Sequence, residues 1–124
     1  RYGNVYGPRQ NAHGEAGVVA IFAGQMLEDE QPVIYGDGTQ TRDYVYVKDV
    51  VKANIDALQS DESGVFTVGT GTETSVNELF DVFAEVAGAD ASREYAAARP
   101  GEQARSVLGY EETTEQIGWS PQVE

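Results

Sequence analysis

The sequence predicts an α/β fold, because short runs of β-branched and aromatic residues alternate along the chain with stretches whose apolar residues repeat at helical spacing. The best strand candidate is the run VFTV at residues 65–68, and the best helix candidate follows it at residues 76–88. The chain has 124 residues, 40% of them hydrophobic, which is enough for the core of one modest domain. We therefore expect a single α/β domain over residues 1–124.

The first third of the chain predicts the end of a strand, a loop and a helix. Residues 1–6 are typical of a strand that ends at Gly7-Pro8, and a polar loop follows. A helix is expected from residue 17 to about residue 29, where the acidic end of the segment sits at the negative pole of the helix dipole. The apolar residues expected on one face of this helix are Val18, Ile21, Phe22 and Met26.

The middle of the chain predicts two extended segments and a second helix. Pro32 ends the first helix, residues 33–35 form a short strand, and residues 42–47 form a second extended segment. The second helix is expected at about residues 48–59, with Asp49 near the positive end of its dipole. Its predicted apolar face consists of Val47, Val51, Ile55 and Leu58.

After the strand at residues 65–68, Ser75 and Glu78 have the spacing of a capping box, which predicts that a helix begins there and ends at Gly88. Residues 92–96 are a candidate strand, and residues 111–117 a short helix. The apolar face of the helix that the capping box opens consists of Val76, Leu79, Phe80, Phe83, Val86 and Ala87.

Composition excludes several classes of protein. The absence of cysteine excludes disulfides and thiolate metal sites, and the single histidine, His13, excludes a histidine-rich metal cluster. The net charge of −13 disfavours nucleic acid and anionic membranes as partners. No apolar run approaches the ~20 residues of a membrane span, and the first residues do not resemble a signal peptide. We therefore expect a soluble, cytoplasmic protein.

The excess of 21 acidic over 8 basic residues predicts adaptation to high salt. An acidic interaction tail is the alternative, but the acidic residues are scattered rather than gathered in one block. Screening lengths shrink to ~3 Å at 1 M salt, so carboxylate repulsion then opposes folding much less. We expect the melting temperature to rise with KCl concentration, as measured by thermal denaturation. A melting temperature that does not change with KCl would contradict this interpretation.

Gly69-Thr70-Gly71 follows a predicted strand and precedes a predicted helix, which is the context of a dinucleotide-binding fingerprint. Thr74 replaces the third glycine of that fingerprint, and Asp90 lies near the spacing of a ribose ligand but in a predicted turn. A structural tight turn is therefore the preferred interpretation, with a cofactor site as the alternative.

Two arginines are candidates for binding an anion. Arg42 follows a Gly-Asp-Gly-Thr turn and Arg99 precedes Pro-Gly, so both are expected to project from loops. Guanidinium groups suit the bidentate binding of a diphosphate. Ion pairs, for example between Arg99 and Glu102, are the alternative. Tyrosines beside these loops either stack on a base or sugar or pack in the sheet, and they are Tyr2, Tyr6, Tyr35, Tyr44 and Tyr46.

Several segments, in chain order, resemble the motifs of one family. RYGNVYGP at residues 1–8 resembles the R-Y-x-N-x-Y-G-P segment of the extended short-chain dehydrogenases that act on sugar nucleotides, the NAD-dependent epimerase/dehydratase family. IYGDGTQTRDYVYVKDV at residues 34–50 is similar to the family's I-Y-G-D-G-x-Q-x-R-D stretch and the strand and helix start that follow it. Residues 66–79, RPGE at residues 99–102 and IGWSP at residues 117–121 match further motifs. The resemblance covers nearly the whole chain.

The resemblance implies the fold and the roles of several residues. The chain would be the C-terminal, substrate-binding part of a Rossmann-type fold, without the N-terminal NAD-binding part. Asn4 would contact the substrate phosphate, Arg42 and Arg99 would hold the diphosphate, and Glu102 would lie near the diphosphate and ribose. Tyr2 would lie close to the nicotinamide. The residues implied to line the nucleotide pocket are Val18 and Val19, with Tyr35 beside the nucleobase.

The family's NAD fingerprint G-x-x-G-x-x-G and its catalytic Tyr-x-x-x-Lys lie upstream of the segments matched here. Tyr44 and Lys48 have the second spacing, but they fall inside the R-D-Y-V-Y-V-K-D match, where a strand meets a helix. Gly3 also departs from the larger residue usual at its position, which leaves the shape of the sugar pocket open. We therefore expect this chain alone to be inactive.

The parent protein implied by the resemblance is an NAD-dependent isomerase, a UDP-glucose or UDP-hexose 4-epimerase that works as a homodimer on a UDP-sugar. Sugar-nucleotide 4,6-dehydratases and UDP-glucuronate decarboxylases share nearly every motif, so they remain alternatives. A non-catalytic nucleotide-sugar-binding module is the alternative from another class.

Overall fold

The computed structural model describes residues 1–11, 17–28, 30–88, 94–98, 101 and 103–123. The chain forms two compact units. Unit 1 comprises Arg1–Pro8, Arg42–Glu73 and Ser106–Glu124, and unit 2 comprises Arg9–Thr41 and Thr74–Arg105. Each unit has a hydrophobic core of its own.

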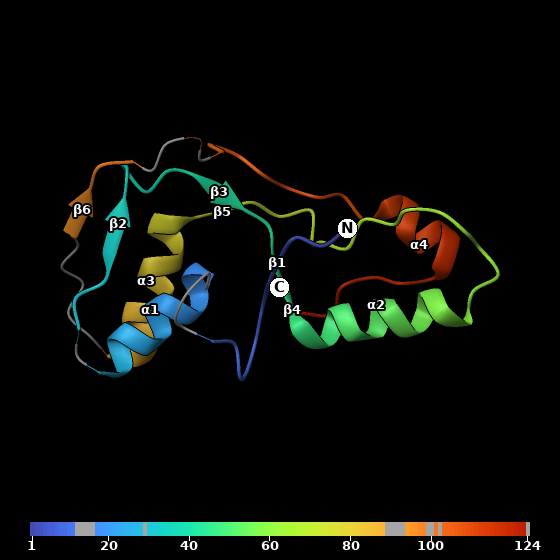
Figure 1. Ribbon diagram of the computed structural model, residues 1–124, viewed down its shortest axis with the longest axis horizontal. Coiled ribbons are helices and arrows are strands. Elements are labelled where there is room, and N and C mark those ends of the chain that lie inside the picture. The colour runs from blue at the N-terminus through green and yellow to red at the C-terminus, as the bar shows by residue number, and fades with distance from the viewer. Residues whose placement is uncertain (12–16, 29, 89–93, 99–100, 102, 124) are drawn as a thin grey trace. The chain divides into compact units, whose positions relative to one another are not determined.

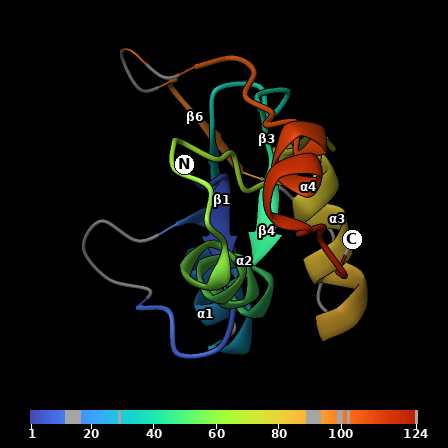
Figure 2. The same cartoon turned by 90° about the vertical axis from the view of Figure 1, so that its right-hand side faces the viewer.

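Unit 1 is built on a short parallel ladder and two helices (Figure 1). Strand β1 (Asn4–Tyr6) pairs in parallel with β4 (Tyr44–Tyr46), and the two strands lie side by side in Figure 2, which looks nearly along α2. Strand β4 leads directly into α2 (Val47–Gln59), and α4 (Glu111–Ile117) follows near the end of the chain. The two-residue strand β3 (Thr41–Arg42) precedes β4. Parallel strands with helices confirm the predicted α/β class.

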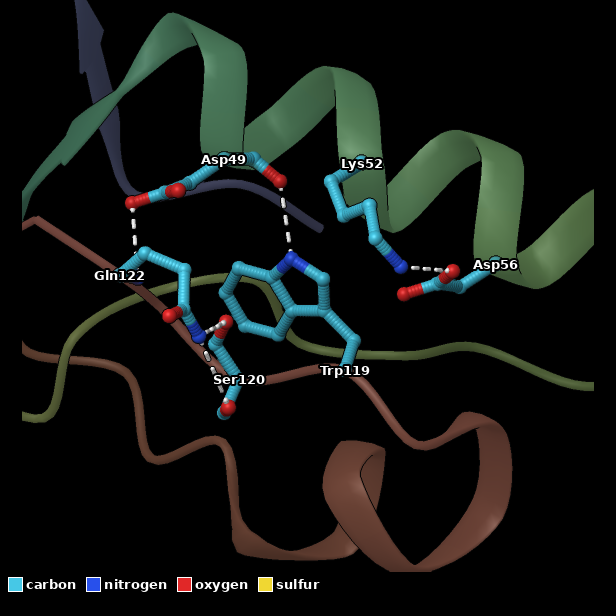
Figure 3. A network of polar contacts seen from close by, with 6 residues as sticks. All are labelled: Asp49, Lys52, Asp56, Trp119, Ser120 and Gln122. Atoms are coloured by element: carbon cyan, nitrogen blue, oxygen red, sulfur yellow. Dashed lines mark hydrogen bonds and ion pairs between the residues drawn. The ribbon is translucent and has the colours of Figure 1, made fainter.

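The core of unit 1 is arranged around Trp119, which is 1% exposed. The indole Nε1 donates to the main-chain oxygen of Asp49 at 2.8 Å (Figure 3). The Asp49 carboxylate in turn accepts from the backbone N–H groups of Gln122 at 3.1 Å and Val123 at 3.0 Å. The first turn of α2 therefore holds the last residues of the chain. The other buried residues of this core are Val45, Val50, Ala53 and Val68.

Unit 2 contains α1 (Val18–Leu27), β2 (Val33–Tyr35), β5 (Thr74–Ser75), α3 (Val76–Ala87) and β6 (Glu94–Ala96). Strands β2 and β6 pair in parallel, with Ile34 opposite Tyr95. Helices α1 and α3 pack together through an edge-to-face contact of Phe22 with Phe80, whose ring centroids are 6.0 Å apart. The buried residues of this core are Phe22, Met26, Ile34, Val76, Phe80 and Ala84.

The ends of α3 form as the sequence predicts. The Ser75 hydroxyl accepts from the backbone N–H of Glu78 at 3.1 Å, which satisfies a donor that the first helical turn leaves free. Gly88 has φ of +64°, the left-handed conformation that commonly ends a helix. The capping box and the glycine therefore predict both ends of this helix correctly.

The prediction of a strand at residues 65–68 is wrong. Val68 forms only an isolated bridge, in parallel with Tyr2: its N–H donates to the Arg1 oxygen at 2.6 Å, and its oxygen accepts from Gly3 at 2.9 Å. Val65 is 73% exposed. A strand requires a ladder of partners as well as β-branched residues, and the segment has a partner at one position. The extended segment at residues 42–47 is also interrupted, at Asp43, between β3 and β4.

The predicted apolar face of α2 is also wrong. Val51 is 50% exposed, Ile55 46% and Leu58 86%, whereas Val50 and Ala53 are buried. Trp119 packs in the same cluster as Val50 and Ala53, so the buried face of the helix is the one that meets it. On α3, Val86 is exposed as well, whereas the other described residues of its predicted face are buried or partly buried. In the part of the chain that the structure describes, no helix is long and apolar enough to cross a membrane.

Candidate functional site

Asp43, which is 1% exposed, joins three segments of unit 1. Its carboxylate accepts from the backbone N–H and the hydroxyl of Thr70, at 2.9 Å and 2.7 Å. It also accepts from the N–H groups of Gly71 at 3.0 Å and Leu108 at 3.1 Å. Its main-chain oxygen accepts from the N–H of Asn4 at 2.7 Å. The side chain of Asp43 thus fixes the Gly-Thr-Gly turn and the segment that precedes α4, and its main chain bonds β1.

The Gly-Thr-Gly turn is already bound to an anion from its own chain. The N–H groups of Thr70 and Gly71 point at the Asp43 carboxylate, as the N–H groups of a nucleotide-binding loop point at a phosphate. A Cβ atom at Gly69 would lie 2.8 Å from both Asp43 Oδ2 and Leu108 Cβ, so the glycine allows close packing inside the protein. These contacts support the interpretation of a structural turn over a cofactor site.

In unit 1 the backbone of Asn4 lies beside the segment that contains Arg42, because the N–H of Asn4 donates to the main-chain oxygen of the next residue, Asp43. The side chain of Asn4 is exposed at the start of β1, and that of Arg42 is half-buried at the end of β3. The Tyr2 ring is 50% exposed, and its hydroxyl donates to Asn54 Oδ1 in α2 at 2.8 Å. A Cβ atom at Gly3 would lie 2.7 Å from the Asp43 oxygen, so a larger residue there would displace this backbone.

Unit 2 contains the turn formed by residues 35–40, which begins at Tyr35 and is closed by hydrogen bonds of its own. The Gln40 side chain donates to the Tyr35 oxygen at 3.0 Å. Asp37 Oδ1 accepts from the backbone N–H of Thr39 at 3.0 Å and from its hydroxyl at 2.6 Å. These two bonds lower the pKa of the Asp37 carboxyl, because they stabilise its charged form. We call residues 35–40 the YGDGTQ turn.

The remaining predicted site residues divide between described and undescribed parts of the chain. Val18 and Val19 form the first turn of α1 and are half-buried, and Val18 packs against the core of unit 2. Arg99 and Glu102 lie outside the described residues, as do His13 and Asp90. Their predicted roles stay predictions.

The Tyr44-x-x-x-Lys48 spacing spans two different elements, since Tyr44 begins β4 and Lys48 lies in the first turn of α2. Tyr44 and Lys48 therefore do not share the helix on which the catalytic pair would lie.

Tyr6, in β1, has a perturbed hydroxyl. Burial raises the pKa of the Tyr6 hydroxyl, with smaller contributions from Asp49 and Tyr46. Among the described residues, no three histidine or carboxylate side chains gather as a metal site would require.

Sequence reasoning did not single out Asp43 or Asn77, the residues that organise these two regions. Asp43 directly precedes the alternation of tyrosine and valine at residues 44–47, so a polar residue at a strand boundary was the available indication. Asn77 follows the helix cap by two positions, where its side-chain and backbone donors reach the YGDGTQ turn. Neither contact follows from spacing along the chain.

Comparison with known proteins gives consistent results. Residues 1–69 match the model of the NAD dependent epimerase/dehydratase family. A putative UDP-glucose 4-epimerase of Methanocaldococcus jannaschii is 48% identical over all 124 residues, which correspond to 40% of its length. The crystal structure of a UDP-glucose 4-epimerase from Thermotoga maritima with UDP-glucose is 49% identical, with a TM-score of 0.97 over 100% of this chain and 40% of that one.

A UDP-glucose 4-epimerase from Thermus thermophilus, in complex with NAD, is 46% identical with a TM-score of 0.88, over 100% of this chain and 41% of that one. The chain thus spans about 40% of the length of the proteins it resembles. The family model matches more than half of the chain. This chain therefore belongs to the NAD dependent epimerase/dehydratase family.

Proposed function

We propose that this chain is the nucleotide-sugar-binding part of an NAD-dependent sugar-nucleotide epimerase, and that the parent enzyme inverts C4 of a UDP-hexose. The observation that carries the proposal is the similarity along the whole chain to a UDP-glucose 4-epimerase bound to UDP-glucose, at 49% identity and a TM-score of 0.97. In this proposal the parent is cytoplasmic and forms a homodimer.

The substrate diphosphate is bound by Arg42 and Arg99, and Asn4 contacts a phosphate. Asp43 supports this assignment for two of the three residues, because it fixes the backbone of Asn4 and directly follows Arg42. A guanidinium group suits bidentate binding of a diphosphate, and a backbone that is held in place lowers the entropic cost of positioning it. Glu102 lies near the diphosphate and ribose, and Val18, Val19 and Tyr35 line the nucleotide side of the pocket.

NAD is bound mainly by residues outside this chain. The Gly-Thr-Gly turn of unit 1 cannot hold the NAD diphosphate in the present fold, since Asp43 occupies its N–H donors. The half-exposed ring of Tyr2 fits a position beside the nicotinamide, with its hydroxyl fixed by Asn54. When bound, NAD accepts a hydride from the sugar and returns it. This chain supplies substrate binding and is inactive alone.

The test is product analysis of the complete parent enzyme in about molar KCl, given UDP-galactose without added NAD. We expect UDP-glucose, because an epimerase carries NAD bound and regenerates it in each turnover. A 4-keto-6-deoxy product from a nucleotide glucose would assign a dehydratase, and carbon dioxide from UDP-glucuronate would assign a decarboxylase. No product from any of these substrates, together with UDP binding, would favour a non-catalytic binding module.

A further inference from the structure

The first turn of α3 holds the YGDGTQ turn. The Asn77 side-chain amide donates from Nδ2 to the main-chain oxygen of Asp37 at 3.0 Å, and the Asn77 backbone N–H donates to the oxygen of Gly38 at 3.0 Å. The N–H of Val76 donates to the oxygen of Gln40 at 3.1 Å. The main-chain oxygens of Asp37, Gly38 and Gln40 are thus all bonded to the two residues that open α3.

The contact between the turn and Asn77 leaves no room for a side chain. Gly38 has φ of +77°, a conformation that favours glycine, and a Cβ atom there would lie 2.2 Å from Asn77 Oδ1. Any other residue at position 38 would push the amide away and strain the backbone. Gly38 and Asn77 therefore form one tightly packed pair.

A second contact orients the Asn77 amide. The hydroxyl of Tyr95 donates to Asn77 Oδ1 at 3.2 Å, so Nδ2 is the atom that faces Asp37. Tyr95 lies in β6 directly opposite Ile34 in β2, and β2 ends at Tyr35. The amide thus links the strand beside Tyr35 to the turn that follows it.

Tyr35 itself is presented at the base of this turn. Its main-chain oxygen is bonded within the turn by Gln40, and its side chain is 39% exposed. The position of the ring is therefore set by the conformation of residues 36–40 together with the pairing of β2 with β6. Asn77 contributes the side-chain bond that ties those residues to α3.

From these contacts we infer that Asn77 is a positioning residue for recognition of the nucleobase: it holds the YGDGTQ turn in the conformation that presents Tyr35 to the base. The inference rests on the proposed function, which places Tyr35 beside the nucleobase. Without the amide, the turn samples further conformations, and binding must then order it. Affinity falls for every ligand that binds through its base, whether or not it carries phosphate.

The test compares uridine with UDP in NMR titrations of the complete parent enzyme. For Asn77→Ala we expect both affinities to fall by the same factor, about five- to tenfold, and the shifts that the base induces in the Tyr35 ring to shrink. Arg42→Ala should lower the affinity for UDP and leave the affinity for uridine unchanged, because uridine has no phosphate. Ala84→Gly, which weakens α3 away from the turn, is the stability control and should leave both affinities unchanged.

Two further variants separate positioning from loss of structure. Tyr95→Phe keeps the bond from Asn77 to Asp37, so it should lower the affinities for uridine and UDP less than Asn77→Ala does. Gly38→Ala should reproduce the Asn77→Ala effect from the other side of the contact. The inference would be wrong if Asn77→Ala bound uridine with wild-type affinity. It would also be wrong if Ala84→Gly lowered the affinities for both ligands as much as Asn77→Ala does. A wild-type parent enzyme that binds neither uridine nor UDP would instead contradict the proposed function.

Discussion

Replacing Asp43 by asparagine should lower the free energy of unfolding of unit 1 by about 3 kcal/mol. The reason is that a buried carboxylate, which accepts from four donors, loses one of its two acceptor oxygens to an NH₂ group. The Asp43 carboxylate accepts from Thr70 twice, from Gly71 and from Leu108, all within 3.1 Å. An asparagine offers one oxygen and places an NH₂ group against the remaining N–H donors. Each buried donor left without a partner costs roughly 1–3 kcal/mol.

The measurement is urea denaturation followed by the fluorescence of Trp119, the only tryptophan in the sequence, which lies in the core of unit 1. Asp61→Asn removes the same charge from an exposed position and should change stability by no more than about 0.5 kcal/mol. This control matters because removing any negative charge from a chain of net charge −13 relieves repulsion. Equal midpoints for the two variants would show that the Asp43 carboxylate does not hold the Gly-Thr-Gly turn and the segment before α4 in place.

A loss of stability at Asp43 would also bear on the proposed site, since the main-chain oxygen of the segment that this carboxylate anchors accepts from the N–H of Asn4. Substrate-binding residues on loops are useful only where a rigid contact sets their position. Here the buried Asp43 carboxylate holds its own segment against the Gly-Thr-Gly turn, and the main chain of that segment bonds Asn4 and follows Arg42. Asp43 is therefore a residue whose substitution affects fold and proposed function together.

Local chemistry explains which parts of the fold the sequence predicted. The ends of α3 depend on residues within four positions of each other, the Ser75 hydroxyl with the Glu78 N–H and the conformation of Gly88. Likewise α1 was predicted with its buried residues Phe22 and Met26, because one face of a helix is visible in its own spacing. Such features need no knowledge of distant segments.

The incorrect predictions all depend on partners far along the chain. Residues 65–68 have strand-forming side chains, but their backbone pairs with another segment at a single bridge, made with the residues around Tyr2. The buried face of α2 is set by Trp119, some seventy positions away, so spacing within the helix selected the wrong residues. The roles of Asp43 and Asn77 were not predicted for the same reason. The groups to which they bond lie in other segments of the chain, and only the fold brings these segments together.

Trp119 should be the other residue with a large effect: we expect Trp119→Ala to destabilise unit 1 by about 4 kcal/mol. The side chain is 1% exposed and packs with Val45, Val50 and Ala53, so its removal leaves a cavity in the core. It also meets the Tyr110 ring edge to face at 6.2 Å. Because the variant has no tryptophan, unfolding is followed by circular dichroism, with the wild type measured in the same way.

Trp119→Phe separates the two contributions of this side chain. The phenyl ring keeps most of the packing but cannot donate to the Asp49 oxygen, so we expect a smaller loss of about 1–2 kcal/mol. Leu58→Ala, a truncation at a residue that is 86% exposed, is the surface control and should be nearly neutral. If Trp119→Phe were as damaging as Trp119→Ala, the hydrogen bond to the first turn of α2, rather than the volume of the ring, would be what holds the end of the chain in place.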